Sequence, residues 1–259
     1  DLHSFPTRRS SDLWSYWCGE KKPINDTGKN YMSNIHPKIL FIPGWTYTLA
    51  NVQPLVKALR RRGLTVEFLK VPGLTGEPLS SSWNLAAYRR WLEERVCQQN
   101  KPLILMGHSN GGRIILSYLA GKTSPQVRGA ILLASAGLLD RRPMVLAKKH
   151  LLAFLAHLAA PLKHFSWCRR LVYVLIGERD YYLATPVMRQ TMANLVAQDL
   201  APVVTKIKVP VLLFWGKRDK ATPFYLGQQL AGLIPNSWLI TYNQAGAPKI
   251  GRASCRERV

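Results

Sequence analysis

The chain has 259 residues, of which 47% are hydrophobic and 19% charged, a balance typical of a globular protein with a sizeable core. No apolar run reaches the ~18 residues that a membrane-spanning helix needs, which excludes a chain built on such helices. The 36 Lys and Arg residues against 14 Asp and Glu give a net charge of +22, which favours anionic surfaces or substrates, or reflects a host with generally basic proteins.

The two ends of the chain are complementary at the level of codons. The codons of residues 3–12 can be the reverse complement of those of residues 250–259, without a break. We therefore expect residues 1–13 and 249–259 to be translated sequencing-adapter sequence rather than parts of a domain. A basic targeting tail is the alternative, but it leaves the complementarity unexplained. On this interpretation the chain is C-terminally truncated.

The predicted elements follow in chain order. Residues 14–31 have no clear hydrophobic period, and Met32 stands shortly before the first predicted strand, so we interpret Met32 as the true start. Apolar runs without alternation, such as Lys38–Ile42, are typical of strands buried on both faces of a parallel sheet. The sequence predicts strands at 38–42, 64–71, 102–106, 130–134, 211–215 and 238–242, and helices at 51–62, 85–96 and 113–120. This alternation predicts an α/β fold with a mostly parallel, doubly wound sheet.

Residues 140–199 interrupt the alternation. From Arg141 to Gly177 there is no acidic residue, and Lys and Arg are interleaved with Leu, Phe, Trp and Tyr. The pattern predicts an all-helical cap insertion between the two parts of the core, 32–139 and 200–248, over the carboxyl edge of the sheet, where open α/β sheets bind ligands. Its basic character favours an anionic or carrier-bound acyl substrate, and is also compatible with weak contact with an anionic membrane surface.

The segment Gly107-His108-Ser109-Asn110-Gly111 fits the G-x-S-x-G pattern of a nucleophile elbow. A predicted buried strand precedes it and a predicted helix follows at once, which is the context that this motif requires. Small residues beside the serine let the backbones pass, and the helix N-terminus favours developing negative charge. Ser109 is therefore predicted to be a nucleophile; the alternative is a glycine-rich turn that carries a serine incidentally.

With this motif the chain resembles the α/β-hydrolase superfamily over most of residues 38–248. Pro43-Gly44-Trp45, directly after the first strand, looks like the oxyanion loop of that family, with Pro43 where a histidine is usual. The resemblance implies that the backbone N–H groups of Trp45 and Asn110 bind the oxyanion of an acyl intermediate. An ordinary Pro-Gly turn is the alternative.

A second match to the family is the segment 215–223, which reads WGKRDKATP. The resemblance implies that Asp219, at the end of its strand, is the triad acid, which orients a histidine and stabilises the imidazolium. A loop aspartate that caps the next helix is the alternative. Asp180 and Asp199, within the insertion, are weaker candidates for the acid.

The histidine of the triad has no counterpart in the sequence. The family places it just after the last strand, where this chain reads Gln244-Ala245-Gly246-Ala247-Pro248. His108 lies beside the serine that it would have to serve. His150, His157 and His164 recur every seven residues and are predicted to lie on one surface of a cap helix, where substitution for the base is the minor alternative. We therefore expect little activity on p-nitrophenyl esters.

Taken together, these patterns predict a serine hydrolase of carboxylic esters or related acyl substrates. A carbon–carbon bond hydrolase, thioesterase or acyltransferase of the same fold remains an alternative, as does a non-catalytic binding protein on this scaffold. Cys97 and Cys168 lack metal-ligand spacing, which indicates reduced cysteines and a cytoplasmic protein. We predict no metal, no cofactor and no nucleic-acid partner.

Overall fold

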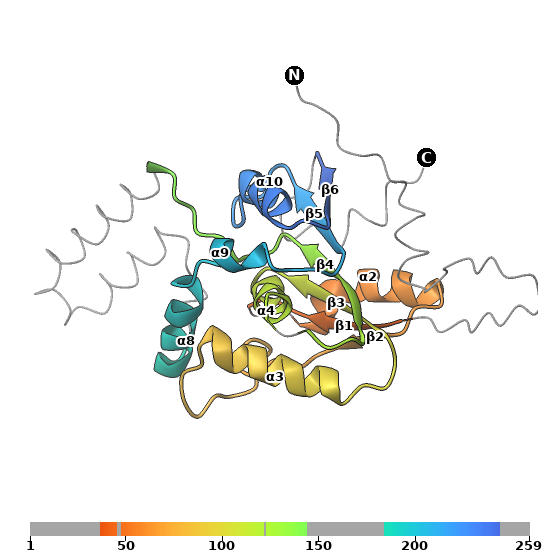
Figure 1. The fold of residues 1–259 in the computed structure, drawn as a ribbon. Helices are drawn as coiled ribbons and strands as arrows, with labels where there is room; N and C mark the ends of the chain where they lie inside the picture. The colour runs from red at the N-terminus through yellow and green to blue at the C-terminus, as the bar shows by residue number, and fades with distance from the viewer. Residues whose placement is uncertain (1–36, 46–47, 122, 144–183, 244–259) are drawn as a thin grey trace, which may run out of the picture.

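The computed structural model describes residues 37–45, 48–121, 123–143 and 184–243. In this part of the chain six parallel strands form one sheet in the order β2-β1-β3-β4-β5-β6 (Figure 1). The strands are β1 (Lys38–Ile42), β2 (Val66–Phe68), β3 (Leu103–His108), β4 (Val127–Leu133), β5 (Val211–Gly216) and β6 (Ser237–Tyr242). The helices are α2 (Leu49–Arg61), α3 (Leu85–Cys97), α4 (Asn110–Leu119), α8 (Pro186–Val196), α9 (Ala201–Val204) and α10 (Phe224–Leu233). The predicted α/β fold with a parallel sheet is confirmed.

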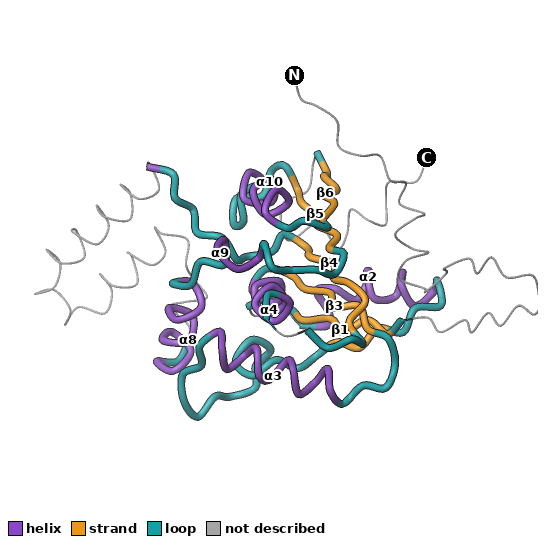
Figure 2. Tube along the Cα trace, in the orientation of Figure 1, coloured by secondary structure: helices purple, strands orange, loops and turns teal. Residues whose placement is uncertain are grey.

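The central strands are buried on both faces because helices lie on either side of the sheet (Figure 2). Every residue of β3 is buried, and Ile39–Ile42 of β1 are at most 1% exposed. Apolar runs without alternation satisfy both covered faces, since each successive side chain points to the opposite side of a strand. The continuous apolar pattern in the sequence thus specifies the middle of the sheet.

The helices divide between the two faces according to the direction of each crossover. A Cβ added to Gly107 would lie 2.6 Å from Ile115 of α4, and one added to Gly227 of α10 would lie 2.6 Å from the ring of Trp215. Strand register places these contacts on one face. The β1–α2–β2 connection runs along the sheet in the opposite direction, and right-handed crossovers therefore place α2 on the other face, as Figure 1 shows.

Several elements differ in extent from their prediction, and two of them, β2 and α4, show why. The strand expected at 64–71 is ordered as β2 over Val66–Phe68 only, because the chain then turns: Thr75 binds Val71 through backbone and side-chain hydrogen bonds, and Gly73 has a φ of 74°. The helix expected from residue 113 begins at Asn110, directly after Ser109. For β2, alternating apolar residues are found in extended loops as well as in strands. For α4, the glycines at positions 111 and 112 have low helix propensity, so the sequence pattern does not indicate that the helix begins before them.

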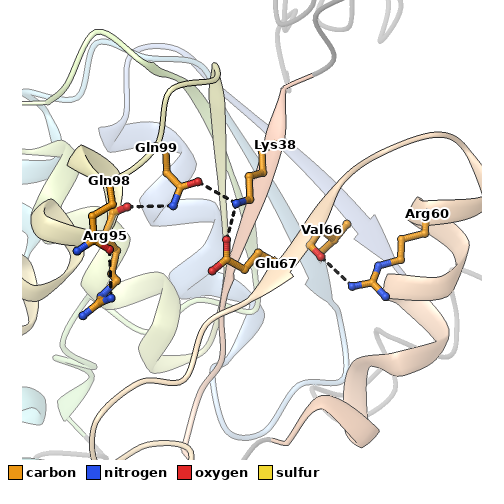
Figure 3. Close-up of polar contacts among 7 residues, drawn as sticks. All are labelled: Lys38, Arg60, Val66, Glu67, Arg95, Gln98 and Gln99. Atoms are coloured by element: carbon orange, nitrogen blue, oxygen red, sulfur yellow. Dashed lines mark hydrogen bonds and ion pairs between the residues drawn. The ribbon is translucent and has the colours of Figure 1, made fainter.

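Side chains tie the β2 edge of the sheet to its neighbours (Figure 3). Lys38 Nζ lies 2.6 Å from Glu67 Oε2 and donates a 2.8 Å hydrogen bond to Gln99 Oε1, joining β1 to β2 and to the end of α3. Arg60 Nη2 donates a 3.0 Å hydrogen bond to the Val66 carbonyl, joining α2 to β2. These groups are partly exposed, so each contact contributes little to stability, about 0–1 kcal/mol.

Part of the sheet face opposite α10 carries partly exposed apolar side chains. Strand register places Leu212 and Phe214 of β5 beside Trp238, Ile240 and Tyr242 of β6 on this face. Ile240 is 36% exposed, and the rings of Phe214 and Tyr242 stack with centroids 6.3 Å apart. Among the described helices, α2 lies on this side and packs against the far end of the sheet, at β2.

The predicted cap, residues 140–199, lies largely outside the described residues. Its described end contains α8, in which Thr185 caps the N-terminus by accepting a hydrogen bond from the Met188 N–H. Asn194 Nδ2 and Thr191 Oγ1 of α8 bond to the backbone of Trp83, which ties α8 to the loop before α3. No helix within the described ranges has the length and apolar character that crossing a membrane requires.

Candidate active site

Ser109 lies in the tight turn between β3 and α4, at the carboxyl edge of the sheet. Its φ of 50° and ψ of −117° are a conformation that residues with a Cβ adopt rarely. Its N–H donates to the Leu133 carbonyl of β4, and its carbonyl accepts from Ala136. Strain of this kind costs of order 1–3 kcal/mol and persists only where the surrounding structure enforces it, which makes the turn a candidate for function.

Close backbone packing enforces this turn. A Cβ on Gly111 would lie 2.0 Å from the carbonyl oxygen of Ile42, and one on Gly112 would lie 2.1 Å from Ser135 Oγ. Gly107 would meet the backbone of Gly111 and Gly112 at 2.8 Å or less. Each of these positions therefore requires glycine, and together they fix the angle between β3 and α4.

The predicted oxyanion loop lies against the serine. A Cβ on Gly44 would stand 3.0 Å from Ser109 Cβ and 3.2 Å from His108 Nδ1, so the Pro43–Trp45 segment passes directly beside the turn. Asn110 is the first residue of α4, whose initial N–H groups have no carbonyl of their own helix to bind. Gly44, the neighbour of Trp45, and Asn110 thus approach Ser109 from two elements, and Asn110 lies at the positive end of α4.

His108 is the last residue of β3 and is 7% exposed. Burial lowers the pKa of His108 to about 4, so its ring is neutral at physiological pH. Its Nδ1 lies 3.2 Å from where a Cβ on Gly44 would stand, so the ring is next to the predicted oxyanion loop. Its environment therefore disfavours the imidazolium that a general base must become.

Asp219 lies in the turn that follows β5. Its Oδ1 accepts hydrogen bonds of 2.9 Å from the N–H groups of Ala221 and Thr222, whereas its Oδ2 is buried and has no hydrogen-bond partner among the described residues. Burial raises the pKa of Asp219, against the lowering effect of these two N–H groups. The residue does not cap α10, whose N-cap is Pro223, so the alternative of a helix cap does not fit.

Thr222 fastens the aspartate turn to the rest of the site. Its Oγ1 donates to the Ala134 carbonyl at the end of β4, and its own carbonyl accepts from Trp215 Nε1 at 2.7 Å. Ala134 has a φ of 43°, so β4 also ends in a strained turn at this edge. The turns after β3, β4 and β5 are therefore connected, and they bring the Ser109 and Asp219 turns to the same edge of the sheet.

Comparison with known proteins agrees with this geometry. Residues 39–246 match the alpha/beta hydrolase family. The chain belongs to this family. A curated relative, the uncharacterized hydrolase YugF of Bacillus subtilis (strain 168), is 30% identical over 165 residues, which are 57% of this chain and 59% of YugF, so the chain spans less than two thirds of that relative.

Solved structures of the family share the fold. The esterase EaEST from Exiguobacterium antarcticum superposes with a TM-score of 0.62 at 18% identity, covering 82% of this chain and 85% of the esterase. The enol-lactonase from Burkholderia xenovorans LB400 gives a TM-score of 0.60 at 21% identity, covering 85% and 88%. At such identities the likeness shows the fold alone, because the same fold supports many chemistries.

The basic residues at the described start of the predicted cap are paired with carboxylates. Arg141 Nη2 lies 2.7 Å from Asp199 Oδ2, and Arg142 Nη2 lies 2.8 Å from Asp140 Oδ2. The hydrogen bond from Arg142 lowers the pKa of Asp140 to about 2, and the Arg142 guanidinium also stands 4.4 Å from the centre of the Tyr225 ring. These two arginines are therefore engaged within the protein, and sequence analysis had counted them among the groups that favour an anionic substrate.

Of the weaker candidates for the acid, one is bound by other groups and one lies outside the described residues. Asp199 is bound by Arg141 and by the N–H groups of Leu139 and Ala201, which leaves it a structural role. Asp180 lies outside the described residues. Within the described ranges, no group of three or more His, Cys, Asp or Glu side chains could hold a metal ion.

Sequence analysis missed Arg113, which is 4% exposed in the first turn of α4. A charged residue within an otherwise apolar helix segment, before Ile114, Ile115 and Leu116, was the available signal. Lys and Arg are almost never fully buried without partners. Its partners lie more than eighty residues away and could not be inferred from local pattern.

Proposed function

We propose that this chain is a serine hydrolase that cleaves carboxylic esters or related acyl substrates through an acyl-enzyme on Ser109. The observation that carries the proposal is the strained Ser109 conformation at the β3–α4 turn, which three crowded glycines enforce. Such a turn exposes the serine hydroxyl above the sheet and directs the N-terminus of α4 at the reacting carbonyl. The neighbouring esterase and enol-lactonase structures accord with this reaction class.

In the proposed reaction, Ser109 Oγ attacks the carbonyl carbon while its proton passes to a base. The N–H groups of Trp45 and Asn110 stabilise the oxyanion, the ester C–O bond breaks, and the leaving alcohol takes the proton back. Water then attacks the acyl-enzyme by the same sequence, releasing the acid and regenerating Ser109. Asp219 Oδ2 would bind the N–H of the protonated base.

The general base of this reaction is not assigned to any histidine of the given sequence. The sequence has no histidine beyond His164, and His108 is buried with its pKa held near 4. We therefore propose low intrinsic turnover that added imidazole raises, because free imidazole can take the proton and donate its N–H to Asp219 Oδ2. A non-catalytic binding protein is the competing function, and the lack of a histidine in the given sequence after His164 is what favours it.

Hydrolysis of p-nitrophenyl butyrate, with and without imidazole, tests the proposal. We expect imidazole-supported turnover that Ser109→Ala abolishes, while Ser117→Ala, a partly buried serine later in α4, retains it. Equal imidazole-dependent rates in wild type and Ser109→Ala would exclude Ser109 as the nucleophile. The p-nitrophenol release from imidazole alone is subtracted as the blank.

The substrate side of the proposal concerns the acyl group. We propose that residues 32–139 and 200–248 form one domain, that residues 140–199 form its cap, and that the cap favours small anionic or carrier-bound acyl groups. Arg169 and Arg170, which lie outside the described residues, are the basic residues to substitute. Their loss should raise KM for acidic acyl substrates more than for neutral ones, and an unchanged ratio would contradict this selectivity.

A further inference from the structure

Arg113 is a buried cation four residues after Ser109. Its Nη1 donates to the carbonyls of Leu195 at 2.7 Å and Gln198 at 2.6 Å, while its Nε has no hydrogen-bond partner among the described residues. Burial lowers the pKa of Arg113 to about 10, and the nearby carboxylate of Asp199 opposes this effect. The guanidinium is therefore charged at neutral pH, and its charge is balanced by carbonyl dipoles and one carboxylate.

Leu195 lies in the last turn of α8, and Gln198 follows directly after the C-cap residue of that helix, Ala197. The last carbonyls of a helix have no partner within the helix and carry the negative end of its dipole. The last turn of α8 contains no basic residue that could bind them. Arg113 supplies both the donor and the positive charge from α4, 82 residues earlier in the chain.

A second set of contacts holds the chain leaving β4 against the chain returning after α8. Asp199 Oδ1 accepts from the Leu139 N–H at 3.4 Å, and Asp199 Oδ2 lies 2.7 Å from Arg141 Nη2. The Leu200 N–H donates to the Gly137 carbonyl at 2.9 Å. Both ends of the segment between β4 and α9 therefore meet at one place, directly beside the carbonyls that Arg113 binds.

This junction is connected to the serine turn by the backbone. The Ala136 N–H donates to the Ser109 carbonyl at 3.0 Å, and the Arg113 N–H donates to the same oxygen at 3.2 Å. Ser135 lies so close to Gly112 that a Cβ there would overlap its hydroxyl. A shift of the 135–137 backbone or of the first turn of α4 would therefore move Ser109.

We propose that Arg113 is a positioning residue. Its guanidinium holds the end of α8 against α4. Through the junction that Asp199 and Leu200 form with residues 137–141, it also fixes the two backbone segments that contact Ser109, residues 135–137 and the first turn of α4. The inference rests on the proposed function of Ser109 as nucleophile. It explains why a charge is buried beside the serine turn, at a cost that an apolar residue would avoid.

Amide hydrogen exchange and serine reactivity together test the inference. Arg113→Met should accelerate exchange in peptides covering residues 134–142 and 193–201 by about tenfold or more, while the amides of β3 keep their protection. The rate at which a fluorophosphonate labels Ser109, with imidazole added, should fall by about tenfold, because a small misplacement of reacting groups is costly. Arg113→Lys should restore much of both, since the ammonium can still donate to these carbonyls.

Two further variants keep the test decisive. Arg60→Met removes an arginine that also donates to a backbone carbonyl, on the far side of the sheet, and should change neither readout (Figure 3). If Arg113→Met does not fold, Asp199→Asn weakens the same junction from the other side and should loosen residues 134–142. If amide exchange in residues 134–142 and 193–201 stays at the wild-type rate in Arg113→Met, the inference is overturned. It is also overturned if exchange there accelerates but the fluorophosphonate still labels Ser109 at the wild-type rate. If exchange accelerates in the variant but the fluorophosphonate does not label Ser109 even in the wild-type protein, the proposed function is contradicted instead.

Discussion

The proposed nucleophile turn, at Ser109, and the proposed acid turn, at Asp219, are built in different ways. Around Ser109, backbone contacts leave no freedom: Gly111 faces a carbonyl oxygen at a distance that admits no side chain. Asp219 is held by one carboxylate oxygen only, and its Oδ2 has no partner in the described part of the chain. Ser109 is thus fixed by local sterics, whereas one oxygen of the Asp219 carboxylate is left without a hydrogen bond in the described part of the chain.

This difference indicates which perturbations each turn tolerates. A sterically locked turn fails when volume is added, because backbone atoms cannot move aside cheaply. A buried carboxylate with a hydrogen bond to only one oxygen instead makes stability depend on pH and on added hydrogen-bond donors, because its negative charge is not fully balanced by neighbouring groups. Predictions on the two turns should therefore differ in kind as well as in size.

The largest expected effect is that of Gly111→Ala. Its Cβ would lie 2.0 Å from the Ile42 carbonyl oxygen and 2.7 Å from that of Pro43, so the β1 loop or the turn must shift. We expect a loss of about 4 kcal/mol or more in the free energy of unfolding, or failure to fold. Urea denaturation measures it, with Gly232→Ala in α10 as the control: no atom lies within 4 Å there, and alanine should stabilise the helix by up to ~1 kcal/mol. Equal effects of the two substitutions would refute the steric account.

Replacing Ser109 by glycine tests the strain itself. Glycine adopts a positive φ without penalty, so Ser109→Gly should raise the free energy of unfolding by about 1–2 kcal/mol while removing the nucleophile. Ser109→Ala keeps the Cβ and should not gain this stability. The pair is compared by urea denaturation, and a destabilised glycine variant would show that the turn is not strained.

The acid turn is tested by pH. Because burial raises the pKa of Asp219 in the folded state, the stability that its protonated form contributes is complete below the ordinary value of 3.8 and is lost as pH rises through the raised folded value. Asp219→Asn does not titrate, so its stability relative to wild type should increase over that window and become constant above it. Melting temperatures between pH 3 and 8 measure the difference. A difference that does not vary with pH would show that the Asp219 charge is already balanced in the fold.

The contrast also explains what could be predicted from the sequence. The serine turn is a local feature: a buried strand, three glycines and a helix lie within a few residues, and its steric requirements follow from that order. Asp219 was predicted as the acid from the resemblance of residues 215–223 to the family, but the lack of an Oδ2 partner among the described residues depends on the packing around it. Arg113 escaped prediction because an arginine early in a helix is ordinarily exposed, and its carbonyl partners lie in the last turn of α8 and just after it.

Charge was the property for which local pattern was least reliable. The basic run that begins at Arg141 favoured an anionic substrate, yet Arg141 and Arg142 are bound to Asp199 and Asp140. One of these carboxylates lies 58 residues away from its arginine, and only the fold brings the two together. The high net positive charge of the chain therefore did not show where an anionic substrate would bind.

The most direct test of the central claim is to identify the residue that a fluorophosphonate modifies. Wild-type protein and Ser109→Ala are treated in the presence of imidazole, digested, and analysed by mass spectrometry. We expect one phosphonylated peptide, modified at Ser109, and no adduct at that peptide in Ser109→Ala. An adduct on a different residue, or none on wild type at any imidazole concentration, would contradict Ser109 as the nucleophile.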